Sequence, residues 1–156
     1  MVKENFHSDG WLLINKPQGI ESFGVIRKLK FRYSFKKIGF AGTLDPLASG
    51  LLLVGINKAT KKIPNIHQEK KSYEVEIRFG ASTNTLDSEG RFFKMESSSH
   101  NINERVLHLK KFIGTYQQKI PDFSAHKLNG KNFYELARDN KAIEDRYKKV
   151  SVQSLK

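Results

Sequence analysis

Cysteine is absent from the 156 residues, which excludes disulfide bonds and thiolate chemistry and fits a reducing compartment. No apolar run approaches the roughly 20 residues that a membrane-spanning helix needs. The Val-Lys-Glu-Asn that follows Met1 does not begin the apolar core of a signal peptide. The length suits one domain with a sizeable core, and no linker divides it. We therefore expect a single-domain cytoplasmic protein with no membrane partner.

Several signatures of common chemistry are also missing. The sequence contains no GxxxxGK[ST] phosphate loop, no GxGxxG dinucleotide motif, no HExxH pair and no GxSxG elbow. The histidines are scattered without the spacing of metal ligands, at His7, His67, His100, His108 and His126. We expect neither a cofactor nor a metal. Carboxylates, tyrosines, positive charge and glycine-containing loops remain as the groups that could carry chemistry.

Acidic residues are few relative to basic ones. The chain has 28 Lys and Arg against 16 Asp and Glu, a formal net charge of +12. The excess is spread over both halves rather than confined to a tail. Such a balance favours a polyanionic partner, and nucleic acid before a membrane because no basic amphipathic helix has a wide apolar face. A lysine-rich composition without a specific partner is the alternative.

One carboxylate stands out within the loop of residues 39–50. Asp45 lies between glycines, and Pro46 biases it away from helix toward an extended or turn conformation. Small residues around it leave room for a bulky group, and an apolar run at 51–54 leaves the loop as a predicted buried strand. An acid on such a loop indicates a reactive or ligand-binding group. The plainer alternative is an Asp-Pro turn between two strands.

The remaining pattern predicts an α+β fold, because strands and helices mix without a regular βαβ alternation. The clearest strand is 72–79, where apolar and polar residues alternate. Ser22 and Asn103 are the expected N-caps of two helices, the first with Phe23, Ile26, Leu29 and Tyr33 on its apolar side. Pro64 is expected to shorten or kink a helix over 59–66. In full, strands are expected at 11–14, 51–54, 72–79, 90–94 and 150–152, and helices at 22–33, 59–66, 103–113 and 133–137.

Five blocks carry a resemblance to a known family. They are residues 13–19 (LINKPQG), 39–50 (GFAGTLDPLASG), 71–75 (KSYEV), 83–90 (TNTLDSEG) and 121–127 (PDFSAHK). Gly130, Tyr134, Ala137 and Arg138 follow the last block and belong to the same likeness. In this order they resemble TruB-type tRNA pseudouridine synthases, whose catalytic loop reads approximately G-H-x-G-x-L-D-P-x-A-x-G. The likeness runs from about Gly10 to the end of the chain. It implies a mixed, largely antiparallel sheet with flanking helices, with residues 1–156 as the N-terminal portion of the catalytic domain.

The resemblance implies a reaction. Family members convert a uridine in the T-loop of tRNA to pseudouridine, so the expected partner is the T-arm stem-loop of tRNA. The target base must leave its stack and enter a pocket. Asp45 is then the catalytic carboxylate, and whether it attacks the uracil ring or the anomeric carbon of the sugar is left open. Tyr73 matches the tyrosine that stacks on the target base, with a role in proton transfer also left open.

Other positions follow from the same resemblance. Lys16 and Lys127 match basic positions expected near RNA phosphates or the pocket. Phe40, Gly42, Thr43 and Asp87 complete the expected substrate-binding set. Phe40 departs from the family because it replaces the usual histidine, and an aromatic ring can stack but cannot donate to a phosphate. Glu21 and Phe123 also replace the usual Thr or Ser and the usual Tyr.

The sequence given stops at Lys156, before a Gly-Thr-Tyr-Ile-Arg-like segment whose arginine pairs with the catalytic Asp in the family. We therefore expect a truncated catalytic domain, an enzyme by family that is inactive as this chain alone. The alternative is a non-catalytic RNA-binding fragment. A relationship to large-subunit ribosomal RNA pseudouridine synthases is weaker, because their loop reads more like R-L-D-x-x-T-S-G.

Overall fold

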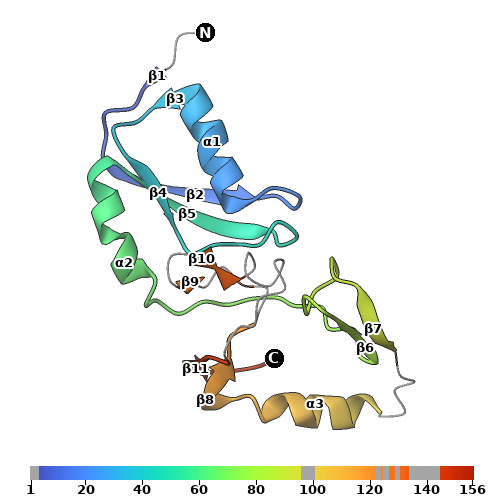
Figure 1. The fold of residues 1–156 in the computed structure, drawn as a ribbon. Coiled ribbons are helices and arrows are strands. Elements are labelled where there is room, and N and C mark those ends of the chain that lie inside the picture. The colour runs from blue at the N-terminus through green and yellow to red at the C-terminus, as the bar shows by residue number, and fades with distance from the viewer. Residues whose placement is uncertain (1–3, 96–100, 122–123, 125–126, 129–130, 134–144) are drawn as a thin grey trace. The chain divides into compact units, whose positions relative to one another are not determined.

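The computed structural model describes residues 4–95, 101–121, 124, 127–128, 131–133 and 145–156. The chain divides into two compact units, Met1–Glu74 and Val75–Lys156, and each is treated by itself (Figure 1). Within the described residues, no helix is long and apolar enough to cross a membrane.

The first unit is built on a three-stranded antiparallel sheet with the order β2-β5-β4. Its strands are β2 (Gly10–Lys16), β4 (Ile38–Ala41) and β5 (Gly50–Ile56). The central strand β5 buries Leu52, Val54 and Ile56, which share one face because side chains alternate along a strand. Gly10 pairs with Ile56 at one end of the sheet, and Lys16 pairs with Gly50 at the other. The apolar runs at 11–14 and 51–54 therefore form the predicted strands.

Helix α1 (Ser22–Arg32) covers this sheet (Figure 1). Val25 and Ile26 pack against Leu52 and Val54, and partly buried residues surround this cluster: Leu12, Ile14, Ile20, Leu29, Ile38 and Phe40. Each fully buried aliphatic side chain contributes about 1.5–3 kcal/mol. The core of the unit is therefore the layer between α1 and β5.

The predicted N-cap of α1 was wrong by one residue. Glu21 occupies the cap position and its side chain makes no capping hydrogen bond, while Ser22 is already helical. Phe23 was expected on the inner face but its side chain is 54% exposed, and Val25 is buried instead. The true inner face is set by the position of the sheet, which local spacing alone does not reveal.

Short elements surround the sheet. Strand β1 (Glu4–Asn5) pairs in parallel with β3 (Tyr33–Ser34). After β5 come the 3-10 helix η1 (Asn57–Lys62) and the four-residue helix α2 (Ile63–Ile66). Pro64 was expected to shorten or kink a helix over 59–66. It lies in the first turn of α2, where a proline is tolerated because its missing N–H has no helical partner there.

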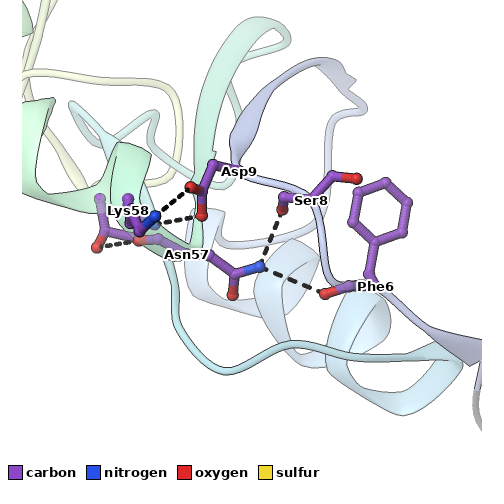
Figure 2. A network of polar contacts seen from close by, with 6 residues as sticks. Phe6, Ser8, Asp9, Asn57 and Lys58 are labelled. Atoms are coloured by element: carbon purple, nitrogen blue, oxygen red, sulfur yellow. Dashed lines mark hydrogen bonds and ion pairs between the residues drawn. The ribbon is translucent and has the colours of Figure 1, made fainter.

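The end of the sheet at Gly10 is tied by a polar network (Figure 2). The Asn57 side-chain amide donates to the carbonyl oxygens of Phe6 (3.3 Å) and Ser8 (2.9 Å). Its oxygen accepts from the Lys37 backbone N–H at 3.2 Å. Asp9 accepts from the Lys58 N–H at 3.0 Å and pairs with its ammonium at 3.5 Å. Residues 6–9 are therefore fastened to the junction of β5 and η1.

The described residues of the second unit include small antiparallel pairs and the helix α3 (Ile102–Lys110). The pairs are β6 (Ala81–Thr83) with β7 (Phe92–Met95), β8 (Gly114–Lys119) with β11 (Tyr147–Val152), and β9 (Lys127–Leu128) with β10 (Lys131–Asn132). Asn101, not Asn103, caps α3, because the Asn103 N–H donates to the Asn101 side chain at 2.6 Å. The final strand is longer than the expected 150–152. The expected helix at 133–137 falls mostly outside the described residues.

The predicted strand 72–79 does not form in the described structure. Residues 71–78 have no regular secondary structure, and Tyr73 and Val75 are 71% and 70% exposed. The alternation of residue types is present, but a strand exists only when a neighbour pairs with its backbone. No described segment pairs with 72–79. The α+β class is nevertheless confirmed, with helices and mainly antiparallel strand pairs in the described chain.

Candidate active site

The loop between β4 and β5 presents Asp45 at the Lys16 end of the sheet. Asp45 is exposed in this loop. Gly42 opens the loop with a φ of +77°, a conformation that side-chain-bearing residues rarely adopt. The Ala48 N–H donates to the Asp45 carbonyl oxygen at 3.1 Å, which closes a tight turn at residues 45–48.

Lys16 lies under this loop with its side chain fully buried. Its ammonium donates to the carbonyl oxygens of Pro17 (2.9 Å), Ile20 (2.8 Å) and Pro46 (3.4 Å). A buried charge is costly unless it is hydrogen-bonded, and these three acceptors match the three donors of an ammonium. The described contacts of Lys16 therefore support the loop. Its contact with RNA stays a prediction.

The turn after Lys16 adds a second donor to the same acceptor. The Gly19 backbone N–H donates to the Pro46 carbonyl oxygen at 2.8 Å. Two groups from residues 16–19 thus hold the carbonyl of Pro46, the residue that directly follows Asp45. This contact joins two of the sequence blocks on which the family resemblance rests.

Ser22 holds the peptide on the other side of Asp45. Its hydroxyl donates to the Leu44 carbonyl oxygen and accepts from the Leu44 N–H, both at 2.9 Å. The side chain is 1% exposed. Sequence reasoning assigned Ser22 to helix capping and missed this role, because nothing local shows that its partner is 22 residues away. Asp45 is therefore flanked by two backbone positions that are each fixed from residues 16–22.

The other predicted residues of this loop differ in their surroundings. Phe40 lies in β4, pairs with Val54 of β5 and packs, partly buried, against the core. Thr43 is exposed. Gly42 supplies the left-handed backbone described above. Contact of any of these residues with a target base stays a prediction.

Tyr73 lies at the end of the first unit with its side chain 71% exposed. Its ring is accessible, as a stacking role requires, but no strand fixes it in the described structure. Tyr73 therefore remains a candidate on resemblance alone.

Asp87 belongs to the second unit, in the loop between β6 and β7. Its carboxylate accepts from the Thr85 hydroxyl at 2.6 Å and from the Glu89 N–H at 3.0 Å. Its carbonyl oxygen accepts from the Thr83 hydroxyl at 2.7 Å. A Cβ at Gly90 would collide with the Thr85 hydroxyl and meet the Thr83 Cβ at 2.9 Å, so this close approach requires glycine. The described contacts of Asp87 organise its own loop, and substrate contact stays a prediction.

Lys127 lies in β9, where it pairs with Asn132 of β10. The rest of its sequence block at 122–123 and 125–126 lies outside the described residues, as do Gly130, Tyr134, Ala137 and Arg138. In the described part of the chain, no group of three His, Cys, Asp or Glu side chains could hold a metal ion.

The sequence profile of the TruB family pseudouridylate synthase (N terminal domain) matches residues 29–156. The chain belongs to the TruB family. The match contains Asp45, Tyr73, Asp87 and Lys127, and it confirms the resemblance inferred from the five sequence blocks.

Curated relatives agree with this assignment. The chain is 41% identical over 135 residues to tRNA pseudouridine synthase B of Ruegeria sp. (strain TM1040), covering 86% of this chain and 45% of that protein. It is 40% identical over 156 residues to tRNA pseudouridine synthase B of Clostridium kluyveri and over 147 residues to that of Aquifex aeolicus. Each of these two alignments covers 94% of this chain and 51% of the relative. The TruB-family chain thus spans about half the length of these relatives.

Basic residues lie at the Gly10 end of the sheet, opposite the Asp45 loop. Asp9 lies among them, and the Lys58 N–H that donates to it holds the pKa of Asp9 below its usual value, aided by the positive charges of Lys58 and Lys36. Glu4 pairs with Arg32 at 3.5 Å. The exposed cations of this end, here called the basic end, are Arg32, Lys36, Lys37 and Lys58.

Proposed function

We propose that the chain is the N-terminal part of the catalytic domain of a tRNA pseudouridine synthase that isomerises a T-loop uridine. The observation that carries the proposal is Asp45, an exposed carboxylate on a loop fixed on both sides by Lys16, Gly19 and Ser22. Membership of the TruB family and the printed names of the relatives support the substrate class. The absence of cysteine supports a cytoplasmic setting.

The proposed reaction breaks the bond between the ribose and a uracil nitrogen and joins the same ribose carbon to a uracil carbon. It is an isomerisation, so it consumes no oxidant, reductant or cofactor. An ionised Asp45 is suited to be the nucleophile, toward either the uracil ring or the anomeric carbon. Fixing the loop before substrate arrives lowers the entropic cost of orienting the attacking oxygen.

The target base reaches Asp45 only if it leaves the helical stack. Unstacking costs a few kcal/mol and must be offset by contacts in the pocket. An accessible tyrosine ring such as Tyr73 can contribute about 1–3 kcal/mol by stacking on one base. The net charge of +12 favours binding of the surrounding phosphates. Tyr73 is therefore proposed to stabilise the flipped base, and Phe40, Gly42, Thr43, Asp87 and Lys127 to belong to the same substrate-binding set.

A second candidate function is RNA binding without turnover. The chain spans about half of its relatives, and in the described residues no basic side chain forms an ion pair with Asp45. An arginine beside a carboxylate favours its ionised form and orients its oxygens. If such an arginine is supplied by another segment, residues 1–156 alone bind RNA but do not modify it.

Chemical mapping of pseudouridine on a T-arm transcript separates the two functions. We expect no conversion by residues 1–156 alone. Conversion should appear when the chain is extended by the corresponding downstream half of tRNA pseudouridine synthase B, and Asp45→Asn in that extended protein should abolish it. Ser49→Ala changes an exposed residue of the same loop that is outside the proposed substrate-binding set, so it is the matched control and should retain conversion. Conversion that survives Asp45→Asn would refute the assignment of Asp45.

A further inference from the structure

We propose that Ser22 is a positioning residue for Asp45: its hydroxyl fixes the Leu44 backbone and so sets the direction in which the reactive carboxylate is presented. The inference rests on the proposed role of Asp45. It assigns to Ser22 a task in the reaction rather than in the formation of α1.

The geometry supports this task because one hydroxyl satisfies both backbone groups of one residue. The Ser22 hydroxyl donates to the Leu44 carbonyl and accepts from the Leu44 N–H, each at 2.9 Å. The Leu44 carbonyl belongs to the planar peptide that contains the Asp45 nitrogen. Fixing that plane restricts the Asp45 backbone from its amino side. The Pro46 carbonyl, held by Lys16 and Gly19, restricts it from the other side.

Stabilisation of α1 does not explain why residue 22 is a serine. A serine at a helix start normally stabilises it by accepting from a backbone N–H of its own first turn. At this helix, Glu21 holds the cap position without a side-chain bond, and the Ser22 hydroxyl is directed to Leu44. Alanine would favour the helix more and would bring no polar group into the core. The identifiable contribution of the hydroxyl is therefore the loop contact.

A general contribution to folding is the competing explanation, and the chain offers a matched control. Thr60 also has a buried side chain, 8% exposed, and its hydroxyl donates to the Asn57 carbonyl oxygen at 2.8 Å. It lies in the same unit, in η1, which follows the Ile56 end of β5. Thr60→Val removes a buried hydroxyl there, far along the sheet from the Asp45 loop.

Amide hydrogen exchange by NMR on the 156-residue chain tests the loop contact without RNA. Ser22→Ala should speed exchange of the Leu44 amide about tenfold or more, with faster exchange also at Ala48. Val54 in β5 should change no more than it does in Thr60→Val. Ser22→Cys keeps the size of the side chain with a weak hydrogen-bonding group, so it should give an intermediate loop rate. If Ser22→Ala does not fold, Ser22→Cys tests the same contact.

The proposal is overturned if Leu44 exchange stays at the wild-type rate, or if Thr60→Val accelerates it equally. Equal acceleration at Leu44 and Val54 would also overturn it, because that pattern reports general destabilisation.

A kinetic test uses the extended protein of the mapping experiment. Ser22→Ala should lower the single-turnover rate about tenfold or more while leaving the RNA Kd unchanged, because misdirecting a nucleophile slows chemistry rather than binding. An unchanged rate, or a loss confined to Kd, would refute the positioning role. Failure of the proposed function is recognised separately, by conversion that survives Asp45→Asn, and the exchange result would stand in that case.

Discussion

The Lys16 ammonium donates to the Pro46 carbonyl oxygen at 3.4 Å across 30 residues of sequence. This contact links the turn that follows β2 to the residue after Asp45. A buried ammonium that meets carbonyl oxygens instead of a carboxylate has its charge balanced by dipoles alone. The arrangement depends on three converging backbone groups, and it is sensitive to any change of the donor.

We expect Lys16→Met to destabilise the first unit by about 2–4 kcal/mol, because it keeps the apolar stem but removes the ammonium that donates to the Pro17 and Ile20 carbonyls and leaves the Pro46 carbonyl with Gly19 alone. Urea unfolding followed by the fluorescence of Trp11, the only tryptophan, measures this. Lys62→Met, an exposed position of η1, is the control and should stay within about 0.5 kcal/mol of wild type. Equal unfolding midpoints for the two variants would contradict the supporting role of Lys16.

The network around Asp9 predicts a dependence of stability on pH. The folded pKa of Asp9 lies below its ordinary value of 3.8, chiefly because the Lys58 N–H donates to it. A lowered folded pKa contributes stability above the unfolded pKa, and the contribution is lost as pH falls through the folded value. Asp9→Asn should therefore be less stable than wild type at neutral pH, with the difference shrinking as the pH falls below 3.8.

The midpoints of urea unfolding, measured at a series of pH values between neutral and acidic, test this expectation. Glu69→Gln removes an exposed carboxylate of the same unit and serves as the control. The effect of Asp9→Asn should be small, since the ion pair with Lys58 is solvent-exposed. A difference that grows toward acid would show that the sign of the pKa shift is wrong.

The sequence predicted the parts of the fold that local pattern controls. The apolar runs at 11–14 and 51–54 became β2 and β5, because a continuous apolar run bounded by turn residues is typical of a buried strand. The loop at Asp45 was also predicted, since Gly42 permits a left-handed backbone and Pro46 restricts the residue before it. These features depend on residues close in sequence.

Features that depend on distant partners were missed. Residues 72–79 have the alternation of a strand, but pairing requires another segment, and none of the described ones supplies it. The Ser22 hydroxyl has a local use as a helix cap and a distant one at Leu44, and sequence spacing reveals only the first. The burial of Lys16 was likewise unexpected, because a lysine in a basic chain suggests a surface cation. Its three carbonyl acceptors come from two separate turns.

Tyr73 offers a test of base stacking in the extended protein. Tyr73→Phe keeps the ring and loses the hydroxyl, whereas Tyr73→Leu loses both. We expect Leu to weaken binding of the flipped base by about 1–3 kcal/mol and Phe mainly to slow the chemical step. Single-turnover kinetics at several RNA concentrations separate binding from rate. Near-wild-type behaviour of both variants would exclude Tyr73 from the site.

The last prediction concerns the charge of the chain and needs no turnover. A surface that neutralises phosphates releases counterions, so affinity for a T-arm stem-loop should fall steeply with salt. The slope of log affinity against log salt should be about −0.7 to −0.9 per phosphate contacted.

Filter binding from low to moderate salt measures the slope. The double variant Lys36→Gln, Lys37→Gln removes two exposed cations of the basic end. If RNA reaches that end, the salt slope of this variant should be shallower than that of wild type. Lys148→Gln with Lys149→Gln removes the same charge from exposed positions of β11 and is the matched control. An equal reduction in the two double variants would mean that total charge, rather than the basic end, determines RNA binding. Binding that does not change with salt would contradict phosphate recognition altogether.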